Sequence, residues 1–298
     1  MRDRIVRRAA ARVAALAAML LVPAAARAQF TGPCENGGRT GTRIAVAGVF
    51  VGGNAALYEY FRRAWWSGES VDFHVNNDWG MEFRDQDKLG HALGGYHLTR
   101  ISSGLLRAAC VGERKAIWWG AAYAAAFQLQ IEIWDGMQDK YGFSPPDLLF
   151  NTAGAAYAVL QHERPALRAF KPTISYERTV ALERSSEESE LRPTVDYSGQ
   201  TYWISFNPDD VLAPDRARWW PGLLRLSVGR SITDWVNAET LRTQRAANLL
   251  VLSIDVDPTR LPGDHPVWKT IKHQLSYYRF PAPAIVIGPG GGATSWYR

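Results

Sequence analysis

The sequence lacks the motifs by which common enzyme and nucleotide-binding families are recognised. It has no Walker loop, no CxxC pair, no G-x-S-x-G elbow, no H-E-x-x-H motif and no internal repeat. No Ser or Cys stands out as a nucleophile beside a His, so we do not expect acyl-enzyme chemistry. The chain also has no stretch of twenty clean apolar residues, and any membrane span is therefore expected to be short.

The mature chain also lacks an excess of charge of either sign. The full sequence has 34 Lys and Arg against 29 Asp and Glu, and residues 1–28 contain six Arg and one Asp, which leaves 28 of each. The basic character of the full chain therefore belongs to its first residues. A neutral mature chain gives no basis for a nucleic-acid partner.

The first 28 residues have the features of a secretory signal peptide. Five arginines precede or open an apolar segment at 13–22, and Ala26-Arg27-Ala28 is a cleavage signal. We expect cleavage before Gln29 and export to the periplasm or to the membrane-associated cell envelope. An uncleaved anchor helix is the alternative.

Cysteine is scarce, because only Cys34 and Cys110 occur. In an oxidising exported compartment these two residues could form one disulfide, and two unpaired thiols are the alternative. Cys34 is a poor candidate for lipidation. It lies several residues past the cleavage signal and follows Thr-Gly-Pro rather than the small apolar run of lipoprotein signals.

The order of the sequence patterns predicts an α+β protein. Helical patterns cover 44–66, 86–109, 113–139 and 145–163. Strand patterns follow at 195–206, 224–232, 249–256 and 284–287, with a short helix at 268–278. The chain is therefore divided into a signal peptide (1–28), a leader loop (29–43), a helical core domain of about four helices (44–165), a linker (166–195) and a β-rich C-terminal module (196–298).

Small residues recur at a spacing of four in the predicted helices, as in the pair Gly90 and Gly94. This spacing permits close approach of helices, as in membranes. Tryptophans such as Trp65 and Trp134 lie near helix ends, where interfacial aromatic residues collect. We expect the bundle to be membrane-associated, and a compact soluble bundle with an Ala- and Gly-rich core is the alternative.

Polar residues interrupt three of these apolar helices at helical spacing. They are Asp87, Lys88 and His91, then Glu132 with Asp135 and Asp139, and then Asp147 and Asn151. Ionisable groups in apolar helices are costly to bury unless they pair, bind something or react. We therefore expect the three groups to converge on one site.

Residue types suggest candidate roles within this site. A carboxylate at i, i+4 can orient an imidazole, so the candidate catalytic residues are His91, Asp87 and Glu132. The candidate ligand-binding residues are Lys88, Asp147 and Asn151. The candidate ligands of a divalent metal, the one cofactor that these residues suggest, are His91, Glu132 and Asp147.

Structural roles remain open for each of these groups. Asp135, Asp139 and Lys140 lie where the third helix leaves its apolar part and could simply face solvent. Asp147 could only cap the fourth helix. The cluster around Lys88 could only fix the register of the helices.

The order of these polar residues resembles a known pattern. Asp-Lys-x-x-His, an acidic helix and then Ser-x-x-Asp-x-x-x-Asn-x-x-Gly are similar to the YfiM-type family of predicted periplasmic lipoproteins, and C-terminal stretches at 196–203 and 252–257 extend the resemblance over about 44–290. The helical skeleton is also similar to VanZ-like membrane proteins, a group linked to glycopeptide (teicoplanin) resistance. The resemblance implies an envelope location and brings no reaction. The chain departs from both patterns, because the lipoprotein cysteine is missing or displaced and no Arg follows Glu132.

We therefore expect an envelope protein whose helical site binds a lipid-linked or head-group-type ligand. A metal-assisted or acid/base hydrolase that acts on an envelope lipid or a cell-wall intermediate is one alternative. A non-catalytic envelope scaffold is the other. The expected partner is a membrane or a lipid-linked ligand, and the sequence leaves a protein partner open.

Overall fold

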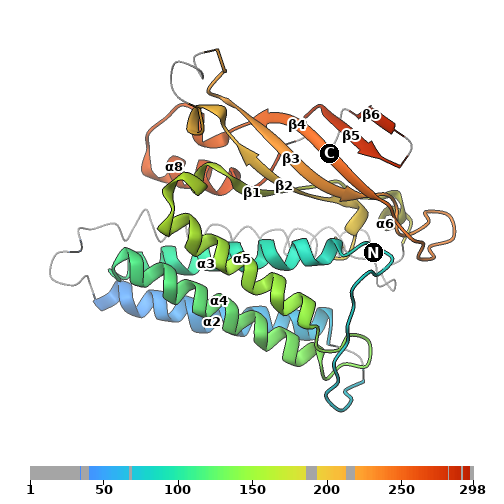
Figure 1. Ribbon diagram of the computed structural model, residues 1–298. Coiled ribbons are helices and arrows are strands. Elements are labelled where there is room, and N and C mark those ends of the chain that lie inside the picture. Colours follow the sequence, from blue (N-terminus) through green and yellow to red (C-terminus); the bar gives the residue numbers. More distant parts are fainter. Residues whose placement is uncertain are drawn as a thin grey trace, which may run out of the picture.

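The computed structural model shows an α+β protein in which a layer of helices lies beside an antiparallel sheet (Figure 1). It describes residues 34, 40–66, 69–185, 193–212, 219–280, 282–289 and 291–295. The expected signal peptide and most of the expected leader loop lie outside these residues. The predicted fold class is confirmed.

Each of the four predicted helices is present. They are α2 (Thr40–Ala64), α3 (Gln86–Ala108), α4 (Glu113–Asp135) and α5 (Pro145–Glu163). Helix α4 ends at Asp135 instead of residue 139, because the chain turns back there and passes through Gly142 at a φ of 94°. Helix α5 begins as predicted, with Ser144 as its cap and two prolines in its first turn.

The sheet is a six-stranded antiparallel meander in which each strand pairs with the next along the chain. The strands are β1 (Lys171–Tyr176), β2 (Gln200–Phe206), β3 (Leu224–Ile232), β4 (Asn248–Val256), β5 (Ala284–Gly288) and β6 (Gly291–Ser295). Short helices α6 (Val180–Arg184) and α8 (Pro266–Leu275) connect them.

The stretch predicted as a linker at 166–195 contains both β1 and α6, which corrects that expectation. The β1 sequence, Lys-Pro-Thr-Ile-Ser-Tyr, is short and largely polar, so its periodicity gives little signal. Its strand conformation comes from pairing with β2 over six residues. Strand β6 was likewise missed, because its sequence is rich in glycine.

The two faces of the sheet differ in an unusual way. One face buries polar side chains: Arg225 Nε and Nη2 donate to the two carboxylate oxygens of Asp255 at 2.9 and 2.8 Å, and Nη1 donates to the carbonyl of Ser276 at 2.7 Å. The other face exposes apolar side chains, namely Ile204, Val228, Leu250, Leu252, Ile254, Ile285 and Ile287. An exposed apolar surface of this extent is typical of an interaction surface.

Small residues bring α3 into close contact with its neighbours. A Cβ on Gly154 would lie 1.8 Å from the carbonyl oxygen of Ala92, and one on Gly95 would lie 2.1 Å from that of Asn151. A Cβ on Gly120 of α4 would lie 2.8 Å from the backbone nitrogen of Ser103. The small-residue spacing therefore serves helix packing at these positions, and it sets the short separation at which the candidate residues meet.

Helix α2 lies beside α4 at the edge of the helical layer (Figure 1) and contacts it mainly through aromatic rings, such as Phe50 and Tyr123 with centroids 4.8 Å apart. Its segment Thr40–Arg63 is long and apolar enough to cross a membrane, with a mean hydropathy of 1.3 and 6 % of the window buried. A disulfide between Cys34 and Cys110 ties the chain before α2 to the end of α3.

Candidate functional site

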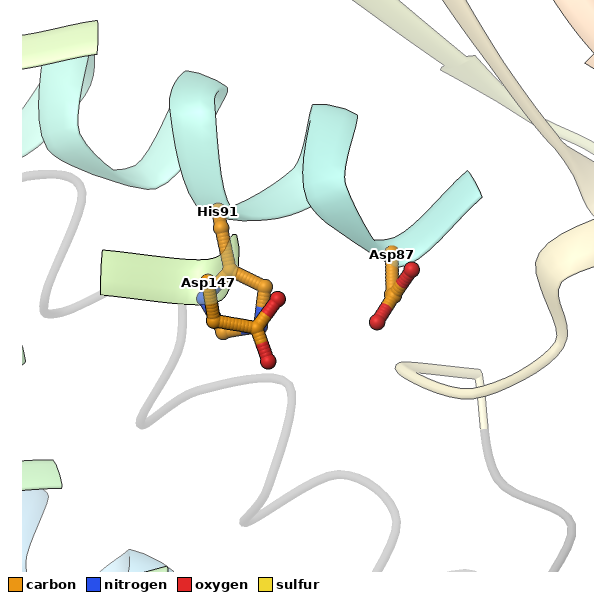
Figure 2. A group of neighbouring side chains, drawn as sticks. All are labelled: Asp87, His91 and Asp147. Atoms are coloured by element: carbon orange, nitrogen blue, oxygen red, sulfur yellow. The ribbon is translucent and has the colours of Figure 1, made fainter. Parts of the chain in front are cut away.

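The structure brings the six predicted polar residues together where α3 and α5 begin and α4 ends. Asp87 and His91 project from successive turns of α3 towards Asp147 in the first turn of α5 (Figure 2). The backbone N–H of Asp147 donates to Ser144 Oγ at 3.1 Å. The capping of α5 by Ser144 therefore leaves the Asp147 carboxylate for other contacts.

Lys88 is the centre of the cluster and its side chain is fully buried. Its Nζ lies 2.5 Å from Asp78 Oδ2, 2.9 Å from Asp87 Oδ2 and 2.8 Å from Asp147 Oδ1. The neighbouring carboxylates outweigh burial and raise the pKa of Lys88, so it is charged at neutral pH. One ammonium thus faces three aspartates, and the cluster keeps a negative surplus.

His91 connects the three helices and keeps 30 % of its side chain exposed. Its Nδ1 lies 3.1 Å from Asn151 Oδ1, and Asn151 Nδ2 donates to Glu132 Oε1 at 3.2 Å. With this amide orientation, Nδ1 carries the proton in neutral His91. The lone pair of Nε2 then faces Asp147 Oδ1 at 3.4 Å, a contact between two acceptors that a proton or a cation would make favourable.

Glu132 is almost fully buried, with 1 % of its side chain exposed. Burial, together with the charges of Asp147 and Asp135, raises its pKa to about 8. The backbone N–H of Ser144 donates to Glu132 Oε2 at 3.4 Å. Glu132 is therefore mostly protonated at neutral pH and adds no full negative charge to the cluster.

Asp87, His91 and Asp147 form a group whose candidate metal-ligand atoms all lie within 4.8 Å of one another. Asp87 Oδ1 is buried and accepts no hydrogen bond from the described part of the chain. Burial is the largest influence on this carboxyl and raises its pKa. Glu132, which we predicted as a metal ligand, lies instead near the other ring nitrogen, 3.8 Å from His91 Nδ1.

One further residue contacts the cluster and was not among the predicted site residues. Asp78, in the loop before α3, accepts from Lys88 Nζ, and its other oxygen accepts from Ser144 Oγ at 2.8 Å. The loop around Asp78 has no periodicity that could have indicated this position. Asp135 accepts from Trp66 Nε1 at 2.5 Å, whereas Asp139 is exposed to solvent.

Exposed apolar side chains lie in or next to the segments that supply the cluster. We call them the apolar rim, which consists of Phe73, Val75, Trp79, Met81 and Leu149. Most of them belong to the loop that carries Asp78, and the Trp79 ring packs on Phe150 of α5 with centroids 5.9 Å apart. The segments that supply the polar cluster thus also expose apolar side chains.

Comparison with protein families gives one match that covers the cluster. Residues 81–163 are similar to the family described as predicted periplasmic lipoprotein (DUF2279). This segment holds α3, α4 and α5 and every residue predicted for the cluster, but it excludes Asp78. No curated protein and no solved structure matches the chain. The expected similarity to VanZ-like membrane proteins stays a prediction.

The family match and the secretory N-terminal sequence give the location. The protein is an exported protein of the periplasm or of the membrane-associated cell envelope. Its two cysteines are joined to each other, so a lipid on the thiol of Cys34 and the disulfide to Cys110 exclude one another. The sequence also argues against lipidation at Cys34, because that residue follows no lipoprotein signal.

Proposed function

We propose that this envelope protein binds an amphiphilic ligand whose amine-bearing head group enters the cluster beside His91. The observation that carries the proposal is an acidic cluster next to exposed apolar side chains. The three aspartates around Lys88 leave a negative surplus. A site of this charge favours an ammonium group over a free phosphate.

The apolar rim supports a lipid-linked ligand instead of a free polar molecule. Trp79 and Leu149 are 49 % and 59 % exposed, and both lie next to the segments that supply Asp78 and Asp147. A head group held at the cluster would place an acyl or prenyl chain against this surface. Burial of that apolar area would add to the binding free energy.

His91 is the group through which a ligand would reach the cluster. It retains 30 % side-chain exposure, whereas Lys88 and Glu132 are almost completely buried. An ammonium beside His91 Nε2 could donate to that nitrogen and to Asp147 Oδ1, which lie 3.4 Å apart. Such a donor would replace the contact between two acceptors by two hydrogen bonds.

The test uses the full mature protein and a short-chain phosphatidylethanolamine as the probe. Asp147→Asn should weaken binding by about tenfold or more, because a charge-assisted contact is lost. Asp139→Asn makes the same chemical change at an exposed carboxylate and should leave binding unchanged. Equal affinities in the two variants, or no binding by the wild type, would contradict the proposal.

A metal-assisted or acid/base hydrolase is a second candidate, favoured by the Asp87, His91 and Asp147 group. These residues offer two carboxylates and an imidazole, which suit a divalent transition metal. Asp147 would share such an ion with Lys88, so binding of the metal must overcome nearby positive charge.

Metal titration separates this candidate from the first. Zinc or manganese should bind the wild type stoichiometrically, with loss of binding in His91→Ala and retention in His162→Ala, a change outside the cluster. Absence of metal binding would remove the metal-assisted form. If His91→Ala lowered only stability and changed neither metal nor lipid binding, the scaffold alternative would hold.

A further inference from the structure

The exposed apolar side chains of the sheet form one continuous surface, which we call the sheet patch. It consists of Ile204, Val228, Leu250, Leu252, Ile254, Ile285 and Ile287. Val228 of β3 pairs with Ile204 of β2 on one side and with Leu252 of β4 on the other. Leu252 pairs in turn with Ile285 of β5. Because residues paired in this way lie about 5 Å apart on the same side of a sheet, the sheet patch runs unbroken from β2 to β5.

No charged side chain interrupts the sheet patch. Side chains alternate between the two faces along each strand, and among the described positions of β2 to β5 the charged residue on this face is Arg230. Its guanidinium lies where the sheet meets the chain before α3, donating to the carbonyl of Arg84 and, at 2.7 Å, to Asn248 Oδ1. The surface beyond that corner is therefore aliphatic.

The sheet patch is accessible to another molecule. Figure 1 shows β1 nearest the helical layer and β5 and β6 on the far side of the sheet. Helix α8 lies against the opposite face, where the carbonyl of Ser276 at its end accepts from Arg225. The seven side chains of the patch are 36–49 % exposed, so the helices leave them uncovered.

The size and the chemistry of the sheet patch fit a second copy of this chain. Seven aliphatic residues at this exposure leave about 500 Å² open to solvent, which is large for a monomeric protein. Two such surfaces in contact would bury about 1,000 Å² in total, the size at which specific interfaces begin. An uncharged surface can also meet its own copy across a two-fold axis without repulsion of like charges. A lipid surface is less favoured, because membrane-binding faces combine apolar side chains with Lys and Arg.

We propose that two copies of the protein associate face to face through the sheet patch, around a two-fold axis. The two sheets would form a sandwich with a spacing of about 10 Å, in which the aliphatic side chains of both copies interdigitate. This proposal does not depend on the function proposed for the acidic cluster, whose residues belong to the helical layer and the loop before α3.

Analytical ultracentrifugation over a concentration series measures the dimer dissociation constant of the full mature protein. Val228→Lys should raise this constant by about tenfold or more, because each copy would bring a lysine into the apolar contact. Since Val228 is 45 % exposed, the lysine can reach solvent in the free chain. The matched control is Val180→Lys on α6, where the valine is 51 % exposed and lies outside the sheet patch, and it should leave the constant unchanged. Ile285→Lys is the second test variant should Val228→Lys not fold.

Two further measurements separate the sheet patch from other surfaces and partners. Val51→Lys changes the exposed apolar surface of α2 and should leave the dimer intact. A monomeric wild type, equal constants for Val228→Lys and Val180→Lys, or a dimer weakened by Val51→Lys alone would overturn the proposal. Flotation with phosphatidylglycerol vesicles tests a lipid partner. Loss of vesicle binding in Val228→Lys without an effect on the dimer would assign the sheet patch to a lipid surface and would also overturn the proposal.

Discussion

Replacing Lys88 by Met tests whether its ammonium is what permits three aspartates to be buried together. The substitution keeps most of the side-chain volume and removes only the charge. Asp78, Asp87 and Asp147 then lose an ammonium at 2.5 to 2.9 Å. We expect the folded state to be strongly destabilised at neutral pH.

The magnitude follows from the geometry. At about 2.8 Å and an effective dielectric constant of about 20, each contact is worth roughly 6 kcal/mol before desolvation. Desolvation offsets much of this, and removal of one partner of a buried ion pair costs about 3–5 kcal/mol in measured cases. We expect a loss in that range, which is a large part of a typical free energy of unfolding of about 5–15 kcal/mol.

The free energy of unfolding of Lys88→Met should depend on pH through the three aspartates that remain. Without Lys88 the aspartates should have pKa values in the folded state well above those of the unfolded chain. The folded variant then binds more protons than the unfolded chain, and its free energy of unfolding rises as the pH falls towards about 5. Urea unfolding at neutral pH and at about pH 5 should show that the loss of stability of Lys88→Met, relative to the wild type, becomes smaller at the lower pH.

Lys272→Met is the matched control, because Lys272 is also buried but donates to the carbonyls of Leu261 and Gly263. Relative to the wild type, it should lose the same amount of stability at neutral and at acidic pH. A second Asp147→Asn change in the Lys88→Met background should restore part of the loss. A loss below about 1 kcal/mol, or no difference in pH response between the two lysine variants, would refute the reasoning.

Three further predictions concern stability. Gly154→Ala should destabilise the folded state by about 3 kcal/mol or more in urea unfolding, because its Cβ would lie 1.8 Å from a backbone oxygen. Gly52→Ala is the control and should be neutral or slightly stabilising, because no described atom lies within 4 Å of its Cβ. Replacement of Cys34 and Cys110 by Ser should cost about 2–5 kcal/mol by the same measurement, because the disulfide closes a loop with a sequence separation of 76. Glu132 releases its proton near pH 4.5 in the unfolded chain and near pH 8 in the folded protein. The free energy of unfolding should therefore fall by an amount of order 5 kcal/mol as the pH rises between these two values. An infrared band of a protonated carboxyl that titrates near pH 8 would verify this prediction.

The helices could be predicted from the sequence because their apolar periodicity is long and their boundaries carry local signals. Ser144 and the following prolines marked the start of α5 to the residue. The strands β3 and β4 were found for a similar reason, since their alternation extends over nine residues each. Strands β1 and β6 were missed because short polar or glycine-rich segments become strands only through their neighbours.

The candidate cluster was predicted in part, and the reason is again periodicity. Asp87, His91 and Asp147 stood out as ionisable groups on apolar helices, and helix packing alone could bring them together. Asp78 lies on a loop, and only the folded chain shows that it shares Lys88 with the others. Asp78 could therefore not be predicted, because no sequence pattern surrounds it, although it is a carboxylate like Asp87 and Asp147.

The spacing of small residues has two different physical meanings in this chain. Gly120 and Gly154 let backbones approach closely, so there the spacing reports helix packing and gives no information about the surroundings. Within the part of the chain that the structure describes, Gly48 and Gly52 on α2 have no neighbouring atoms within 4 Å of an added Cβ, and Val51 between them is 73 % exposed. Helix packing among the described residues does not explain this second pair. A bilayer or another chain would supply the missing contacts, so membrane association rests on α2 and its apolar surface, not on the small-residue pattern as a whole.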